Sequence, residues 1–149
     1  MKPFNPSVLF LTLSVTMSAL TACTSSAPTE PQAGICEKLS MEADGIVRLS
    51  KVEVYPEFLE EYVKFAIQVG EISLRTEPGV LTMYAISQKD NPCLITILET
   101  YASPDAYQSH IASSHFQEYK QGTLHMVKSL ELLDQNPLNA RSRLSNFFE

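Results

Sequence analysis

The first regular pattern of hydrophobic and polar positions lies in residues 45–56, GIVRLSKVEVYP. Successive residues there fall on opposite sides of an extended chain, which is typical of a β-strand whose two faces meet different surroundings. After Pro56 the spacing changes, and apolar residues recur every three or four positions as far as about Thr76: Phe58, Leu59, Tyr62, Phe65, Ala66, Val69 and Ile72. The pattern therefore predicts a strand and then an amphipathic helix with proline at its first position.

A turn and a hairpin follow this helix. Pro78 cannot continue the helical hydrogen bonds, and Gly79 tolerates the conformation of a turn, so EPGV is expected to end the helix. Residues 79–87 and 92–102 are both rich in β-branched and aromatic residues, and the polar segment QKDNP separates them. This arrangement predicts two antiparallel strands joined by a loop of several residues.

The remaining pattern predicts two short helices and a last strand. Ser103 followed by Pro104 is typical of a helix start, and Ser113 or Ser114 opens a second helix, with Ser114 and Gln117 at capping-box spacing. Residues 124–133 mix strand and helix signals and are taken as a strand. The order β-α-β-β-α-β in under a hundred residues predicts an α+β, ferredoxin-like split βαβ fold, with helices on one face of a four-stranded antiparallel sheet.

The N-terminal residues indicate export. Residues 1–22 carry one early charge, Lys2, and an apolar run too short to span a bilayer comfortably. The segment LTAC, at residues 20–23, resembles the lipobox of bacterial lipoproteins. This resemblance implies cleavage before Cys23 and lipidation of that cysteine. An ordinary secretory peptide with an incidental cysteine is the alternative. Thr24 resembles the outer-membrane sorting pattern of bacteria with two membranes.

These features divide the chain into four parts and place it in the cell envelope, facing the periplasm or the exterior. The expected parts are a signal peptide (1–22), a lipid anchor with a flexible tether (23–44), one folded domain (45–135) and a C-terminal tail (136–149). The mature chain would have 149 − 22 = 127 residues, enough for one core. An oxidising compartment would permit a Cys36–Cys93 disulfide, with two unpaired thiols as the alternative.

Charge narrows the class of partner. The net charge is −6, and loss of Lys2 with the signal peptide makes it about −7. No basic cluster interrupts this acidic balance, so nucleic acid is not an expected partner. Membrane contact is expected through the lipid anchor only.

A longer stretch, RTEPGVLTMYAISQKDNPCLITILETYASPDAYQSHIASSHFQEY, resembles the antibiotic biosynthesis monooxygenase family, which includes quinol monooxygenases. The residues that carry the resemblance are spread along the stretch: Arg75, Glu77-Pro78-Gly79, Tyr84, Glu99, Tyr101, Ala106, His110 and Ser114-His115-Phe116. The resemblance implies a homodimer, a dimeric α/β barrel, in which exposed sheet faces pack together. It also implies a pocket on each protomer between sheet and helices.

The family mixes oxygenases that need no cofactor, heme-degrading enzymes and members of unknown activity. The heme-degrading members resemble one another in using a tryptophan, and this chain has none. None of the usual patterns for flavin, nicotinamide or phosphate binding occurs. The expected function is therefore a monooxygenase without cofactor that acts on a small electron-rich aromatic such as a quinol. The alternative is a dimeric ligand-binding or interaction module of the envelope without catalysis.

His110 and His115 are the candidates for proton transfer, because a histidine can take a phenolic proton near neutral pH. The alternative is a structural role, in which they hydrogen-bond to the backbone or to Glu99 and hold the helix junction to the sheet. A shared metal ion is not expected, since five residues of one continuous helix turn the side chains about 140° apart. They can meet only if the chain bends at Ala112-Ser113. Glu99 is expected to orient a histidine, although pairing with Arg75 or Arg48 is an equal alternative.

The expected pocket walls come from the predicted hairpin. Tyr84 and Tyr101 could stack on a planar ring there or donate a hydrogen bond, although core or interface packing is the competing interpretation for both. Met83 is grouped with them as a substrate-binding residue, although methionine more often fills gaps in a core.

Overall fold

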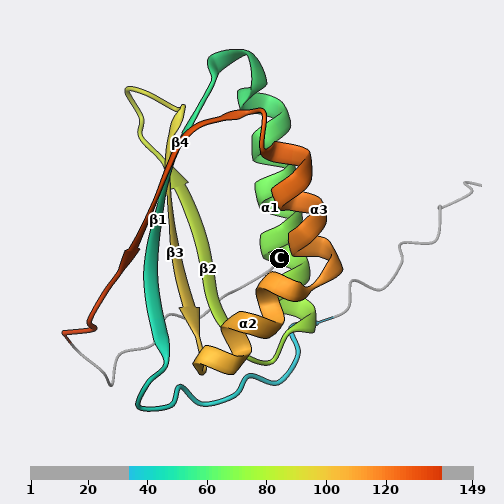
Figure 1. Ribbon diagram of the computed structural model, residues 1–149, viewed down its shortest axis with the longest axis vertical. Helices are drawn as coiled ribbons and strands as arrows, with labels where there is room; N and C mark the ends of the chain where they lie inside the picture. Colours follow the sequence, from blue (N-terminus) through green and yellow to red (C-terminus); the bar gives the residue numbers. More distant parts are fainter. Residues whose placement is uncertain (1–33, 139–149) are drawn as a thin grey trace, which may run out of the picture. The chain divides into compact units, whose positions relative to one another are not determined.

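The computed structural model describes residues 34–138 of the chain, and Figure 1 shows their arrangement. The elements, in chain order, are β1 (Ile46–Val54), η1 (Pro56–Phe58), α1 (Leu59–Thr76), β2 (Val80–Ser87), β3 (Leu94–Tyr101), α2 (Pro104–Ala112), α3 (Ser114–Thr123) and β4 (Val127–Asp134). Each predicted strand and helix is present. The last strand begins three residues later than expected, because Leu124 keeps a helical conformation and the Thr123 carbonyl accepts a hydrogen bond from the Met126 amide.

The four strands form one antiparallel sheet in the order β2-β3-β1-β4. The three α-helices lie on one face of it, and α1 and α3 run side by side (Figure 1). This layering confirms the predicted ferredoxin-like fold. Strands β2 and β4 are the edges of the sheet, so the helices must cover the central strands for a core to form.

The helix-facing side of β1 carries Val52 and Val54, which are both buried, as the alternating pattern predicts. They pack with Tyr62 from α1, Ile95 from β3 and Met126, forming the core at the end of the sheet where α1 begins. A second, smaller cluster of Leu74, Val80 and Tyr101 closes the opposite end. A cavity lies between the sheet and the helices, and it is described below.

Gly79 is needed for close packing and not for an unusual turn. None of the described glycines has positive φ, which corrects the expectation that Gly79 adopts a special turn conformation. A Cβ atom at Gly79 would lie 2.5 Å from the Cβ of Ala106 on α2. Glycine therefore lets the start of β2 and α2 pack closely. The Gly79 carbonyl accepts a hydrogen bond from the Ala102 amide at 2.8 Å.

The break between α2 and α3 falls at Ser113. This residue has extended backbone angles, and its hydroxyl accepts a hydrogen bond from the Phe116 amide, so Ser113 and not Ser114 is the N-cap of α3. The Ser114–Gln117 capping box is consequently not formed. Gln117 instead donates to the Ile111 carbonyl at 2.6 Å, which ties α3 back to α2.

The other face of the sheet is not covered by any described helix. Strand register aligns one row of side chains across it: Tyr84, Leu98, Leu49 and Leu133. Tyr84 is 59% exposed, and Ile86 on the same face of β2 is 52% exposed. This bare face is therefore an apolar surface of the kind that usually contacts another protein surface.

The two described cysteines are free thiols. Cys93 lies at the end of β1 that carries Val54, since the Val54 amide donates to the Cys93 carbonyl. Cys36 lies beside the end of α1, where its amide donates to the Arg75 carbonyl. A nine-residue strand spans roughly 26 Å, so the thiols are too far apart for the disulfide considered above.

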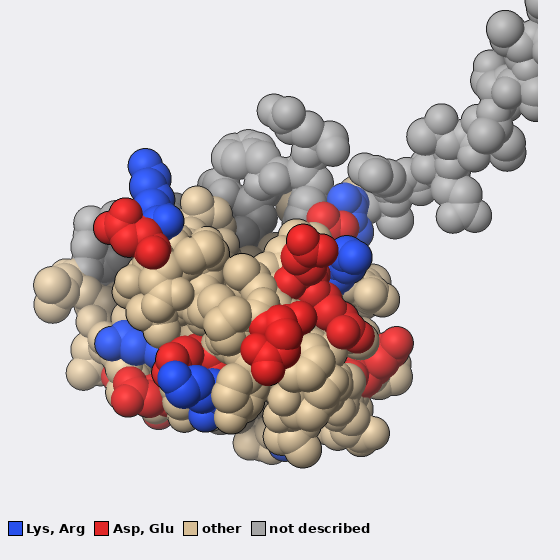
Figure 2. All heavy atoms as spheres, turned by 90° about the horizontal axis from the view of Figure 1, so that it is seen from above, with Lys and Arg blue, Asp and Glu red and all other residues tan. Residues whose placement is uncertain are grey.

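Figure 2 shows one face of the molecule, viewed toward the end where α1 begins, and acidic and basic side chains are interspersed on it. The absence of a nucleic-acid partner stays a prediction. None of the helices within residues 34–138 has the length and apolar character needed to cross a bilayer. The predicted signal peptide, the predicted lipidation site Cys23 and most of the predicted tail lie outside the described residues.

Candidate functional site

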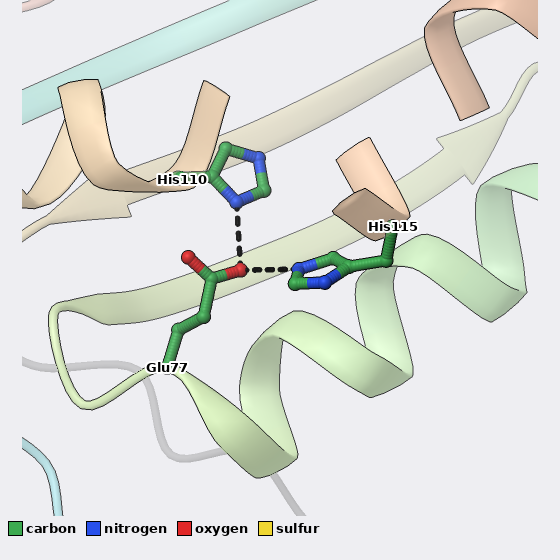
Figure 3. Close-up of side chains that lie close together, drawn as sticks. All are labelled: Glu77, His110 and His115. Atoms are coloured by element: carbon green, nitrogen blue, oxygen red, sulfur yellow. Dashed lines mark hydrogen bonds and ion pairs between the residues drawn. The ribbon is translucent and has the colours of Figure 1, made fainter. Parts of the chain in front are cut away.

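Three helix ends meet at one point of the molecule. Glu77 follows the last turn of α1, His110 lies in the last turn of α2, and His115 lies in the first turn of α3 (Figure 3). The break at Ser113 makes this possible, because it turns α3 back so that the two imidazole centroids are 6.2 Å apart. The bend expected at Ala112-Ser113 is therefore present.

One carboxylate oxygen joins the two histidines. Glu77 Oε1 lies 2.9 Å from His110 Nδ1 and 2.6 Å from His115 Nε2 (Figure 3). The Ser113 hydroxyl is 3.1 Å from the same nitrogen of His115. His110 is 1% exposed, whereas the side chains of Glu77 and His115 are each 15% exposed, so the network runs from the interior toward the surface.

The electrostatics of the network set the histidine tautomers. Burial raises the pKa of the Glu77 carboxyl, but the hydrogen bonds from His110 and His115 outweigh burial, and the net pKa lies below the ordinary value. Glu77 is thus ionised at neutral pH and can only accept hydrogen bonds. His110 must therefore carry its proton on Nδ1, which leaves Nε2 as the acceptor of the neutral ring.

A cavity of about 480 Å³ adjoins His110. It is bounded by the helix-facing side of the sheet and by the inner sides of α1 and α3. Its surface is mostly apolar, and the buried or half-buried polar side chains in its lining are Ser50, Tyr62, Glu99, His110, Tyr119 and Thr123. His110 is the one member of the Glu77–His110–His115 network that lines this cavity among the described residues, so it connects the network to any bound ligand.

Glu99 lines the cavity but does not orient the histidines, which corrects the expectation above. Its Oε1 accepts a hydrogen bond from the Ser50 hydroxyl at 2.5 Å, and its Oε2 accepts one from Tyr101 at 2.7 Å. Arg48, its neighbour across the strands, pairs with Asp134 instead, with Nε 2.7 Å from Oδ1. The carboxylate that orients the histidines is Glu77.

Of the expected pocket walls, Met83 lines the cavity and the two tyrosines do not. Tyr84 projects from the bare face, because β2 register places it opposite Leu98 there. Tyr101 faces the helices but is fully buried under the Tyr107 and His110 rings, with centroid separations of 5.2 and 5.3 Å. Burial, together with the Glu99 charge, raises the pKa of Tyr101 far above its usual value, so it remains a neutral donor.

A tyrosine pair in the cavity was not anticipated from the sequence. Tyr62 on α1 and Tyr119 on α3 bring their hydroxyls to 2.6 Å. Burial is the main cause that raises the pKa of each, so both stay protonated. Tyr62 was predicted only as part of the apolar stripe of α1; its buried hydroxyl needed a partner, and that need was the signal available.

The same three residues could also hold a cation. The ligand atoms of Glu77, His110 and His115 lie within 4.8 Å of one another, and a carboxylate with two imidazoles suits a divalent transition metal. Glu77 is thus a third potential ligand beside the two histidines. The separations of 2.6 and 2.9 Å are also those of N–H···O hydrogen bonds to one oxygen, which account for all three positions without an ion.

Comparison with known proteins gives one family and a set of similar structures. The family model for antibiotic biosynthesis monooxygenases matches residues 45–122. A structure from Bacteroides thetaiotaomicron, assigned as an antibiotic biosynthesis monooxygenase, is 48% identical, with 68% of this chain and 97% of that chain covered and a TM-score of 0.67. A search of curated proteins found no match.

Two further structures extend the comparison. One from Lactobacillus acidophilus, assigned as a monooxygenase, is 31% identical over 62% of this chain and 44% of that chain, with a TM-score of 0.59. One from Caulobacter crescentus, assigned as an antibiotic biosynthesis monooxygenase, is 23% identical over 63% of this chain and 92% of that chain, with a TM-score of 0.57, and supports the fold alone.

Proposed function

Because the chain belongs to the antibiotic biosynthesis monooxygenase family, we propose that it is a cofactor-independent monooxygenase acting on a small electron-rich aromatic such as a quinol. The observation that carries the proposal is the position of His110 between the cavity and Glu77. His110 lines the cavity, and the ionised Glu77 holds its proton on Nδ1. A buried imidazole with a fixed tautomer beside an apolar cavity is suited to act as a general base.

In the proposed reaction, Nε2 of His110 takes the proton of a phenolic hydroxyl. The Glu77 carboxylate then stabilises the imidazolium that forms, in the way that a buried carboxylate supports the histidine of a hydrolase. His115 donates to the same oxygen and holds Glu77 in place. Glu99 keeps unused lone pairs on both oxygens, so it can accept a hydrogen bond from a second hydroxyl of the substrate.

Oxygen chemistry can then follow without an external reductant. The phenolate passes one electron to O₂, and the resulting radical pair combines into a ring peroxide, which takes the proton back from His110 to give a hydroperoxide. Loss of water from it leaves a hydroxyquinone. One oxygen atom enters the ring, the other leaves as water, and all four electrons come from the quinol.

Oxygen uptake with a panel of hydroquinones tests this proposal. We expect His110→Gln to lower kcat by 10²-fold or more, within the range of about 10² to 10⁴ for loss of a general base. The matched control is His125→Ala, because His125 is exposed and lies outside the cavity lining. Equal rates in the parent and in His110→Gln would refute the assignment of His110.

Two controls separate the competing interpretations. Treatment with a chelator should leave oxygen uptake unchanged, and a loss of activity restored by a divalent metal would instead favour a metal at Glu77. Binding of hydroquinones without any oxygen uptake would favour a ligand-binding module of the same fold.

We further propose that two copies associate through the bare face of the sheet. The support is the apolar row of Tyr84, Leu98, Leu49 and Leu133, together with Ile86. Covering such a row removes apolar area from water, at roughly 25 cal/mol for each Å².

The proposed place of action is the cell envelope, with Cys23 as the lipid anchor, as the sequence indicates. Fractionation of cells that produce Cys23→Ala tests this. The parent should sediment with membranes and the variant should be released; a variant that still sediments would refute lipidation at Cys23.

A further inference from the structure

Seven of the residues that line the cavity are exposed, and four of them carry large aliphatic side chains. Ile67 comes from α1, Leu124 follows α3, and Leu130 and Leu132 come from β4, with exposed fractions between 53% and 74%. The other three are Glu71, Ala85 and Lys120. Because the four aliphatic residues both line the cavity and reach solvent, they form the aliphatic part of its rim.

The rim exists because β4 is an edge strand. Leu130 pairs with Val52 and Leu132 pairs with Ser50, so both project from the helix-facing side of the sheet. The partners on β1 are buried, whereas the leucines on β4 are not. The helices therefore cover β1 and leave β4 as an apolar ledge that continues the cavity wall outward.

Another part of the cavity lining is polar and buried. Ser50, Tyr62 and His110 are each less than 5% exposed, and Glu99 accepts a hydrogen bond from the Ser50 hydroxyl. The buried part of the lining thus offers hydrogen-bonding groups, and the exposed part along β4 offers aliphatic groups. A ligand that matches the cavity has a polar ring at one end and an aliphatic part at the other.

The size of the cavity also favours a ligand larger than an unsubstituted aromatic ring. An apolar protein cavity of about 150 Å³ is enough to bind benzene. The cavity here is about 480 Å³, so an unsubstituted hydroquinone would leave most of it unfilled. The remaining space leads to the exposed rim.

From these observations we infer that the substrate is an aromatic ring with an aliphatic chain, whose ring reaches His110 and whose chain leaves over Ile67, Leu124, Leu130 and Leu132. This inference rests on the function proposed above and narrows the substrate class to alkyl-substituted phenols or quinols.

The test measures dissociation constants by titration calorimetry under nitrogen, so that binding is separated from turnover. The probes are hydroquinone and its 2-ethyl, 2-butyl and 2-hexyl derivatives. Affinity should rise two- to fourfold for each methylene, fourfold being full burial of one CH₂ (about 0.8 kcal/mol). Equal dissociation constants across the series would overturn the inference.

Variants of the rim residues test where the alkyl chain of the ligand lies. In Leu130→Ser with Leu132→Ser, the gain in affinity from hydroquinone to its 2-hexyl derivative should be smaller than in the parent. Leu39→Ser is the matched control, since Leu39 is 54% exposed and does not line the cavity. If the rim variant keeps the full chain-length gain but changes the association state, the rim is a contact between protein copies and the inference fails.

The outcomes distinguish this inference from the proposed function. Oxygen uptake with hydroquinone, but no gain in affinity with alkyl-chain length, would refute the alkyl-substituted substrate and still support the monooxygenase. Suppose instead that affinity rises with alkyl-chain length, that the rim variant loses this rise, and that no oxygen is taken up. This result would identify the class of ligand and refute the proposed monooxygenase activity.

Discussion

Glu77 shows how much one side chain decides at the residue scale. It ends α1, yet its Oε1 is the common acceptor for histidines from two other helices. The carboxylate thereby fixes which nitrogen of His110 is free to accept a proton. Glu77 is a positioning residue, since it does not line the cavity itself.

Replacing Glu77 with glutamine should separate positioning from binding. Glu77→Gln keeps the size of the side chain but removes the charge, so His110 loses its fixed tautomer and the support for its protonated form. We expect kcat to fall by roughly 10²-fold or more, with little change in the affinity for hydroquinone. Glu60→Gln, an exposed position of α1, is the control, and a variant of Glu77 with parental kcat would contradict this role.

The lowered pKa of Glu77 also predicts a pH dependence of stability. A carboxyl whose pKa is lower in the folded state stabilises the fold above its unfolded pKa of about 4.3, and this contribution disappears as the pH falls through the folded-state pKa. Urea unfolding should therefore show a parent that is more stable than Glu77→Gln above about pH 5, where the carboxylate is ionised. The difference should shrink below about pH 4; a difference that grows on acidification would refute it.

Sequence reasoning reached the histidines but not their partner. His110 and His115 are close in sequence, whereas Glu77 is 33 residues from His110, and only the fold brings it there. Glu99 was expected on a strand of the hairpin, and it lies on β3, where it lines the cavity. Its partners, however, depend on strand register and on the rotamer of a residue two positions away, Tyr101, which an alternating pattern does not reveal.

At the scale of elements, the α2–α3 junction is the feature on which the site depends. Without the break, the two histidines would lie about 140° apart around one helix. Composition indicated a helix start here but could not choose between Ser113 and Ser114, because both are good caps. The backbone resolves the choice, since only Ser113 has extended angles before the first turn.

The serine pair offers a matched test of the junction. Ser113→Ala removes the acceptor of the Phe116 amide and should lower the free energy of unfolding by about 1 kcal/mol, as is typical of a lost N-cap. Ser114→Ala should change it much less, because that exposed serine is not the cap. Urea denaturation of both variants provides the comparison, and equal losses would show that Ser113 does not cap α3.

The elements themselves were predictable because their periods are clear. The alternation in β1 and the three- and four-residue spacing in α1 match the faces that are buried. The role of Gly79 was not predictable, since its neighbour Ala106 is close only after α2 packs on β2. Such contacts depend on distances between elements, which a sequence pattern does not contain.

At the scale of the whole molecule, both faces of the sheet carry apolar residues, but the described helices cover only one of them. The predicted homodimer remains a proposal, and it has a direct test. Tyr84→Lys places a charge at the β2 end of the apolar row and should convert a dimer into a monomer in light scattering after size exclusion. Tyr55→Lys is the control, because Tyr55 is exposed but lies in the turn after β1. A parent that is monomeric at all concentrations would refute the dimer.

Consecutive residues of β3 serve opposite sides of the molecule. Leu98 lies in the apolar row, and Glu99 lines the cavity. A single inserted or deleted residue in this strand would exchange their faces, placing a carboxylate among the apolar row and a leucine at the polar end of the cavity. During evolution the central strand can therefore accept substitutions at individual positions, but hardly any change of length, and variation in length should accumulate in the β2–β3 loop.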